Sequence, residues 1–252
     1  MFETRGVIDA LTPLTEIVGA DRSRVPALRV SPALAPVLPD GLRRGSTIAV
    51  SGSVSLLLAT VGAASADGAW CALVAMPTIS AEAARGFGIE LARLPMVPSP
   101  GPDWVAVVGA LLDAVDVVVA RVPDRLTDGD IRRLAARVRA KGAVFVPYRA
   151  AARPAGAPVW PHAELSLRAE AADWDGIGTG YGRLRRRRVT VCADGRGRPR
   201  STGLWLPAAT GGTEPVVAAV VEPVVEPVPF AGPPIVVAEP PVERGSRLVA
   251  VR

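Results

Sequence analysis

The chain has 252 residues, 49% of them hydrophobic, and carries 29 Lys and Arg against 24 Asp and Glu, a formal charge of +5. This length suits one good core with a small appendage, and no run reaches the roughly 18 apolar residues of a membrane span. Charges such as Glu3 and Asp9 interrupt the first 20 residues, which lack an apolar stretch, so we expect no signal peptide.

Residues 1–37 predict an N-terminal helical arm and linker. Apolar residues recur near one face over residues 3–20, which predicts a helix, although Pro13 argues for a kink inside it. Four prolines between residues 21 and 45 predict an extended connector, and Asp40-Gly41 is a turn signal ahead of the first strand.

The next segment has the pattern of a nucleotide-binding turn. Residues 46–51 form an apolar strand, and a short Gly/Ser turn leads into an apolar helix over residues 53–66. Such a turn cradles phosphate with glycine amides, while a lysine contacts the β and γ oxygens and a Ser or Thr holds Mg²⁺. Here Gly52, Ser53 and Ser55 are present but no lysine follows, since the single lysine of the chain is Lys141. The sequence therefore predicts the turn but lacks the lysine that would contact phosphate.

Strands and helices alternate from there to residue 148. The predicted elements are a strand over 69–76, a helix over 80–87, a short strand over 94–97, a helix over 104–114 capped by Asp103, a strand over 116–122, a helix over 128–140 between Thr127 and Gly142, and a strand over 144–147. This alternation with short loops predicts an α/β fold, a mostly parallel sheet with helices on both faces.

The pattern changes after Tyr148. Residues 149–163 predict a mobile loop, in which His162, the only histidine, has no partner for a metal site. Residues 189–193 and 201–206, joined by a Gly-rich turn, predict an antiparallel hairpin that closes the sheet. Residues 207–252 are rich in Pro, Val and Glu without periodicity, which predicts a disordered tail.

A Gly-rich stretch lies ahead of the hairpin. Asp173-Trp174-Asp175-Gly176 is followed by Gly178, Gly180 and Gly182, which favours a flexible surface loop rather than a phosphate cradle. Trp160 and Trp174, both in predicted loops, are candidate exposed anchors for a partner, whereas Trp70 and Trp104 are expected to pack in the core. Cys71 and Cys192 lie in predicted strands, which favours buried thiols and a cytoplasmic location.

The order of these parts resembles the RecA-like recombinase core over residues 38–206. Leu38-Pro-Asp-Gly-Leu-Arg-Arg-Gly-Ser-Thr-Ile-Ala-Val-Ser-Gly resembles its lead-in to the first strand, and the segments 70–76, 88–97 and 115–122 follow in the RecA order. Within that group the chain is similar to the actinobacterial ImuA-prime proteins, RecA-like accessory factors of a damage-induced mutagenesis cassette. The closer likeness depends on the Leu-Pro-Asp-Gly-Leu-Arg-Arg-Gly segment, the Pro-Gly-Pro-Asp-Trp turn at 100–104 and the Arg-rich hairpin.

The resemblance implies a degenerate nucleotide site. The phosphate-loop lysine has no counterpart near residues 53–56, the acidic residue that organises Mg²⁺ falls at Arg121, and the general-base carboxylate falls at about Pro77. We therefore expect no cofactor and no enzymatic activity. The implied function is a non-catalytic adaptor of translesion synthesis in the SOS response to DNA damage, binding an ImuB-type polymerase-like protein. A DNA-binding or recombinase-regulating factor and a SulA-like inhibitor of cell division are the alternatives, and self-association stays open.

The densest charge of the chain is a candidate binding patch for nucleic acid or for an acidic protein, although a solvated hairpin face would carry the same charges. It comprises Arg183, Arg185, Arg186, Arg187, Arg188, Arg196, Arg198 and Arg200. Burial of three consecutive unpaired guanidinium groups is too costly, so we expect residues 186–188 at the surface, in a run that begins in a loop or at a sheet edge.

The tail is a second candidate binding segment. Short apolar triplets between prolines repeat over residues 214–237, which suits addition to the sheet edge or docking in the groove of the polymerase-like partner. An inert tail is the alternative. The candidate residues are Val224, Val225, Phe230, Ile235 and Val236.

Overall fold

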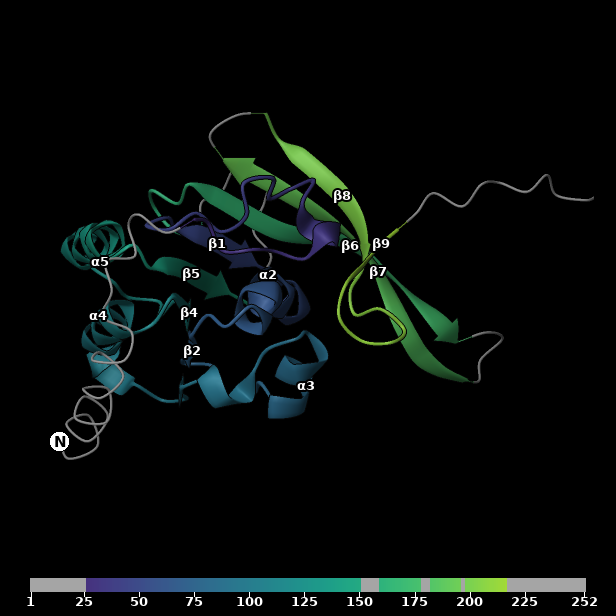
Figure 1. Cartoon of the computed structure of the whole chain (residues 1–252), viewed down its shortest axis with the longest axis horizontal. Helices are drawn as coiled ribbons and strands as arrows, with labels where there is room; N and C mark the ends of the chain where they lie inside the picture. Colours follow the sequence, from purple (N-terminus) through teal and green to yellow (C-terminus); the bar gives the residue numbers. More distant parts are fainter. Residues whose placement is uncertain (1–25, 151–158, 178–181, 196–197, 217–252) are drawn as a thin grey trace, which may run out of the picture. The chain divides into compact units, whose positions relative to one another are not determined.

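The structure is a computed structural model that describes residues 26–150, 159–177, 182–195 and 198–216. Within these residues nine strands form one sheet in the order β3-β2-β4-β5-β1-β6-β7-β8-β9 (Figure 1). The predicted α/β fold with a mostly parallel sheet and a closing antiparallel hairpin is confirmed. The predicted helix over residues 3–20 lies outside the described residues.

The parallel part of the sheet contains short strands, all of them buried except β3. They are β1 (Ile48–Ser51), β2 (Cys71–Val74), β3 (Met96–Val97), β4 (Val117–Arg121) and β5 (Val144–Arg149). The side chains of β1, β2, β4 and β5 are buried on both faces except at the ends of β4 and β5, as expected for continuous apolar runs between two layers of helices. Both residues of the edge strand β3 are exposed or partly exposed.

Helices cover both faces of these strands. They are α2 (Val54–Ala66), α3 (Ala81–Gly86), α4 (Trp104–Ala114) and α5 (Asp128–Lys141), with 3-10 turns η2 (Pro32–Leu34), η3 (Leu91–Arg93) and η4 (Gly101–Asp103). Thr127 and Asp130 form a capping box at the start of α5, and Gly142 ends it in the left-handed conformation at φ 64°. Asp103 is the N-cap residue of α4, as predicted, although its side chain makes no capping hydrogen bond.

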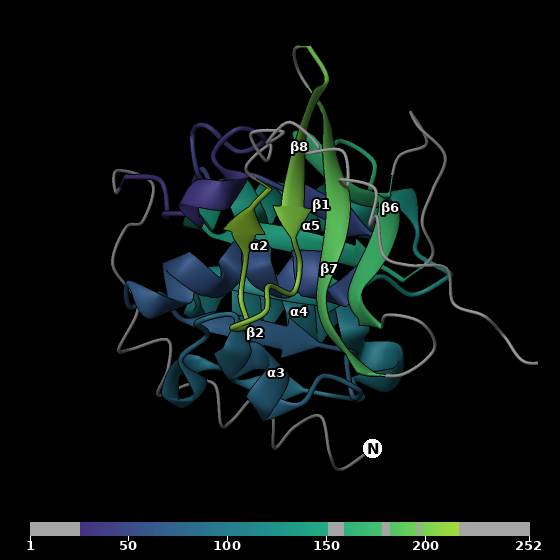
Figure 2. The ribbon, with the colours of Figure 1, turned by 90° about the vertical axis from the view of Figure 1, so that its right-hand side faces the viewer.

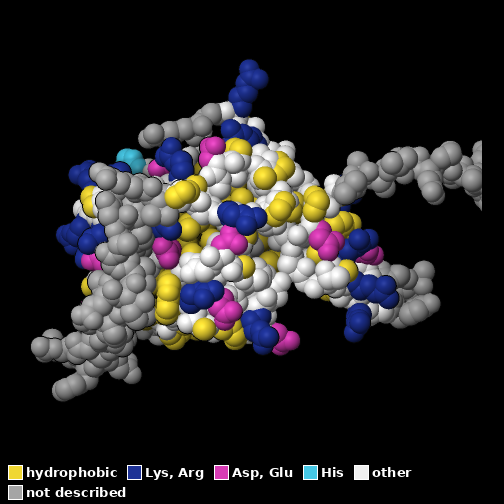
Figure 3. Space-filling view, viewed as in Figure 1, with side chains coloured by type: hydrophobic (Ala, Val, Ile, Leu, Met, Phe, Trp, Pro, Cys, Tyr) yellow, Lys and Arg dark blue, Asp and Glu magenta, His cyan; other side chains and the backbone are white. Residues whose placement is uncertain are grey.

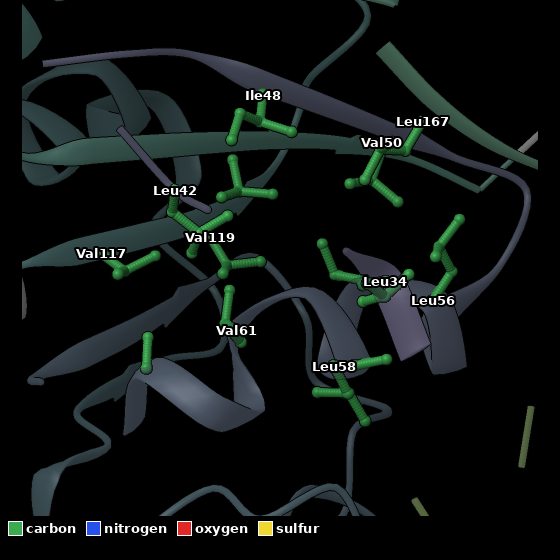
Figure 4. Packing of buried hydrophobic residues seen from close by; sticks show 14 of the residues in the cluster. Leu34, Leu42, Ile48, Val50, Leu56, Leu58, Val61, Val117, Val119 and Leu167 are labelled. Carbon is green, nitrogen blue, oxygen red and sulfur yellow. The ribbon is translucent and has the colours of Figure 1, made fainter. Parts of the chain in front are cut away.

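Two hydrophobic clusters lie on opposite faces of the sheet. One joins α2 and the connector before β1 to the strands, with Leu34, Leu56 and Val119 among its buried residues (Figure 4). The other joins α4 and α5 to the sheet through residues such as Leu111 and Leu134. The proline-rich connector therefore contributes to the core instead of only leading to it.

Trp160 belongs to the second cluster. Its side chain is 2% exposed, and its ring lies 5.2 Å from that of Phe145 and 6.5 Å from that of Trp104. The prediction of an exposed partner anchor at Trp160 is wrong, because edge-on and tilted aromatic contacts hold this loop residue against α4 and β5. Residues 151–158 of the predicted loop lie outside the described residues.

The antiparallel part of the sheet is longer than predicted. It contains β6 (Leu165–Ile177), β7 (Gly182–Gly195), β8 (Arg200–Trp205) and β9 (Glu214–Pro215). The first three lie side by side in Figure 2, and β6 also pairs in parallel with β1, which joins the two parts of the sheet.

The Gly-rich stretch therefore lies in strands up to Ile177 and again from Gly182, which corrects the prediction of a surface loop. Gly176 sits at an irregular point in the pairing with φ 116°, and a Cβ there would lie 2.2 Å from the Arg183 carbonyl oxygen. Glycine at this position permits the close approach of two backbones. Gly178 and Gly180 lie outside the described residues.

The folded unit continues past the predicted start of the tail. Leu206 and Ala208 are 0% and 2% exposed, and β9 pairs with the end of β8. The boundary placed at residue 207 is therefore too early, because these residues complete the core beside β8. The described structure ends at Val216, and residues 217–252 lie outside it. No helix in the described part of the chain has the length and apolar character needed to cross a membrane.

Candidate functional site

The turn between β1 and α2 is only two residues long. Gly52 has φ 79°, and its amide donates to the Arg149 carbonyl at 3.0 Å. Ser53 is 4% exposed and caps α2, because its Oγ accepts the Leu56 amide at 3.2 Å. Ser55 follows in the first turn of the helix. Two amides that could face a phosphate thus already have partners within the chain.

Arginines stand beside this turn at the carboxyl ends of β4 and β5. Arg121, the last residue of β4, is exposed, and Arg149, the last residue of β5, is opposite Ser51 in the sheet. Arg149 lies 3.7 Å from the fully exposed Asp124. Burial raises the pKa of Tyr148, which precedes Arg149, and the Arg121 charge opposes that rise. Two guanidinium groups therefore stand at this edge, one of them near a carboxylate.

The carboxyl end of β2 carries no acidic or basic side chain. Ala75 follows it with φ 59°, and Pro77 is exposed. Within the described ranges, no group of three or more His, Cys, Asp and Glu could hold a metal ion. The three positions singled out by the RecA resemblance thus lie at one edge of the sheet, where phosphate and Mg²⁺ chemistry would need groups that these residues do not supply.

The predicted basic patch is divided between two places. Arg183, Arg185, Arg186, Arg187 and Arg188 lie on β7, and their run is exposed or partly exposed as predicted. Arg198 and Arg200 lie at the opposite end of the hairpin, before and at the start of β8, and are exposed. Arg196 lies outside the described residues, as do Val224, Val225, Phe230, Ile235 and Val236.

The run on β7 begins within a strand, not in a loop. Residues 182–186 nevertheless pair with β6 alone, because β8 ends opposite Arg188 and the backbone of Arg187 bonds to Leu206 and Pro207. The predicted placement at a sheet edge therefore holds for this part of β7. Trp174, on β6, is 48% exposed and lies opposite Arg187 in the register. Only the strand register brings these two residues together.

Cys192 belongs to a polar cluster on the outer face of β7. Its thiol donates to Glu170 at 3.4 Å, and burial together with this carboxylate raises the pKa of Cys192. Cys71 is fully buried in β2, and burial raises its pKa to about 12. Both thiols are therefore protonated at neutral pH and poorly suited to nucleophilic or metal chemistry.

The order of strands and helices, with a closing antiparallel hairpin and a strand–turn–helix at β1, is that of a RecA-like fold. The solved structure of the RadB recombinase superposes with a TM-score of 0.54 and 16% identity, covering 74% of this chain and 97% of that one. At this identity the likeness shows the fold alone.

Sequence comparison then gives the family. The chain is 35% identical over 176 residues to the protein named Uncharacterized protein Rv3395c of Mycobacterium tuberculosis, an alignment that spans 66% of this chain and 80% of that protein. The family described as MT3502 N-terminal domain matches residues 36–153. The chain belongs to the same family as Rv3395c, a family with a RecA-like fold.

Proposed function

We propose that this protein is a RecA-like accessory factor without ATPase activity that acts as an adaptor in the response to DNA damage. The observation that carries the proposal is the two-residue turn between β1 and α2. Its Gly52 amide bonds to Arg149, and the Leu56 amide bonds to Ser53 Oγ. A phosphate loop instead keeps a series of amides open for the nucleotide.

The charge at the sheet edge supports the same conclusion. Mg²⁺ bound with ATP is held by carboxylate and hydroxyl oxygens, whereas Arg149 ends β5, which pairs with β1, and Arg121 ends β4, the next strand beyond it. Two guanidinium groups there raise the energy of a divalent cation, and no lysine stands at the turn to replace it. A scaffold that retains the RecA-like sheet without this chemistry suits a binding function.

The resemblance to ImuA-prime proteins supplies the finer proposal. The adaptor would assemble with an ImuB-type polymerase-like protein in damage-induced translesion synthesis, and its function would need no nucleotide. The Leu-Pro-Asp-Gly-Leu-Arg-Arg-Gly segment that carries the resemblance forms the lead-in to β1, where Leu42 is buried and Arg44 bonds to Asp116 at 2.8 Å.

Titration of the full-length chain with the ImuB-type protein of the same organism tests this proposal. We expect a complex by light scattering and calorimetry, with one affinity in buffer, in Mg-ATP and in Mg-ADP. Failure of the two proteins to associate at micromolar concentrations would remove the adaptor function. Arrest of cell division on expression of the chain would favour the SulA-like alternative instead.

A further inference from the structure

The free end of the β6–β7 hairpin projects from the rest of the described structure (Figure 1). Its residues, 174–177 and 182–187, lie beyond the last pair between β7 and β8, and basic side chains gather over it in Figure 3. This end of the hairpin is thus accessible on more than one side, and its charge is not needed to cover the core.

The two faces of this hairpin differ in whether their arginines are paired with other side chains. Asp175 and Arg186 lie opposite each other and bond at 2.8 Å, and the Arg186 guanidinium lies 3.8 Å from the centre of the Trp205 ring. Residues directly opposite in an antiparallel pair share a face. On this face a carboxylate and a tryptophan therefore already engage the arginine.

The other face carries Trp174 opposite Arg187. The Arg187 guanidinium lies 5.9 Å from the ring centre, well beyond the 3.8 Å of the pair on the first face, and the tryptophan remains 48% exposed. Arg187 Nε is buried without a hydrogen-bond partner. A buried donor without a partner costs free energy. The face thus presents an exposed indole beside the Arg187 guanidinium, whose Nε has no hydrogen-bond partner.

Further positive charge follows at the tip. Arg183 and Arg185 are exposed, and among the described residues neither they nor Arg187 form an ion pair. We call Trp174, Arg183, Arg185 and Arg187 the Trp174 surface. Uncompensated guanidinium groups attract phosphates, and an open aromatic ring stacks on the face of a base.

We propose that the Trp174 surface binds single-stranded nucleic acid, with Trp174 stacked on one base and the three arginines on neighbouring phosphates. A duplex buries its base faces within the stack, so it could use the arginines but not the indole. The proposal does not depend on the adaptor function, because the surface lies on the hairpin and not at the nucleotide-like turn.

Fluorescence anisotropy with a labelled oligothymidine tests it on the full-length chain. We expect saturable binding to the single strand and weaker binding to a duplex of the same length. Trp174→Ala should weaken single-strand binding about 5-fold or more, whereas Trp174→Phe should retain most of it because the aromatic ring remains. With three phosphate contacts, the slope of log affinity against log salt should be about −2, and the triple Arg→Ala variant at 183, 185 and 187 should bring it close to zero.

Leu184→Ala is the matched control. Leu184 is 47% exposed on the same hairpin, so its removal deletes a similar apolar contact without removing a ring. Circular-dichroism melts confirm that each variant is folded. Absence of wild-type binding, or equal losses for Trp174→Ala and Leu184→Ala, would overturn the proposal. Competition by poly-glutamate as strong as by unlabelled oligothymidine would also overturn it, in favour of an acidic protein as the ligand.

Discussion

Arg43 and Arg44 are adjacent in sequence, yet their ion pairs differ in burial. Arg44 donates to Asp116 Oδ1 at 2.8 Å, and these two side chains are 9% and 12% exposed. The other Asp116 oxygen accepts the Trp70 amide at 3.0 Å, so the pair ties the segment before β1 to the starts of β2 and β4. Arg43 pairs with Glu164 at 2.6 Å, but its side chain is 62% exposed.

Removing Arg44 leaves a carboxylate buried with one remaining hydrogen bond. Breaking a buried pair in this way costs about 3–5 kcal/mol, so Arg44→Met should lower the free energy of unfolding by that amount. For a folded unit of this size, each kcal/mol corresponds to about 2–4 °C in Tm, which gives a decrease of about 6–20 °C. Arg43→Met should cost no more than about 1 kcal/mol, because the exposed pair is screened by water.

Urea denaturation followed by circular dichroism measures both variants under the same conditions. Arg44→Met combined with Asp116→Asn should recover part of the loss, since the uncompensated charge is gone while the amide oxygen still accepts from Trp70. Equal stability of the Arg44→Met and Arg43→Met proteins would refute the argument from burial.

Two smaller predictions concern the cysteines and the hairpin. Iodoacetamide at pH 8 should leave Cys71 of the folded chain unmodified, because burial holds its pKa at about 12, and labelling of native Cys71 would contradict this. Glu170→Gln should speed the labelling of Cys192, because it removes a carboxylate that raises the pKa of Cys192. Mass spectrometry of peptides measures the labelling of each cysteine. Gly176→Ala should destabilise the chain by more than about 1 kcal/mol, since φ 116° is strained for alanine and the Cβ would contact the Arg183 carbonyl. An unchanged melting temperature would show that the hairpin backbone shifts to accommodate the added methyl group.

The parallel part of the fold could be predicted because its signals are local. β2 and β4 are continuous apolar runs, and α5 begins at a Thr127–Asp130 box and ends at Gly142. Burial on both faces and helix capping each depend on a few neighbouring residues, so the local sequence predicts them. The same elements also predict which edge of the sheet carries the turn between β1 and α2.

The free end of the β6–β7 hairpin was missed because its pairing is not local. Its glycines resemble a loop, and only the register sets Asp175 against Arg186 and Trp174 against Arg187. The alternation of Asp173 and Asp175 around a tryptophan, two residues apart as in a strand, was the available signal. Trp160 was missed for a similar reason, since its partners Phe145 and Trp104 come from other elements.

The central claim is that the β1–α2 turn supports no nucleotide chemistry, and steady-state turnover of Mg-ATP by the purified chain tests it most directly. We expect background turnover with and without single-stranded DNA, the same for wild type and for the Ser53→Ala/Ser55→Ala variant. That variant should lose about 1 kcal/mol of stability, because Ser53 caps α2. Turnover that rises in proportion to the protein concentration and disappears in the double variant would contradict the account.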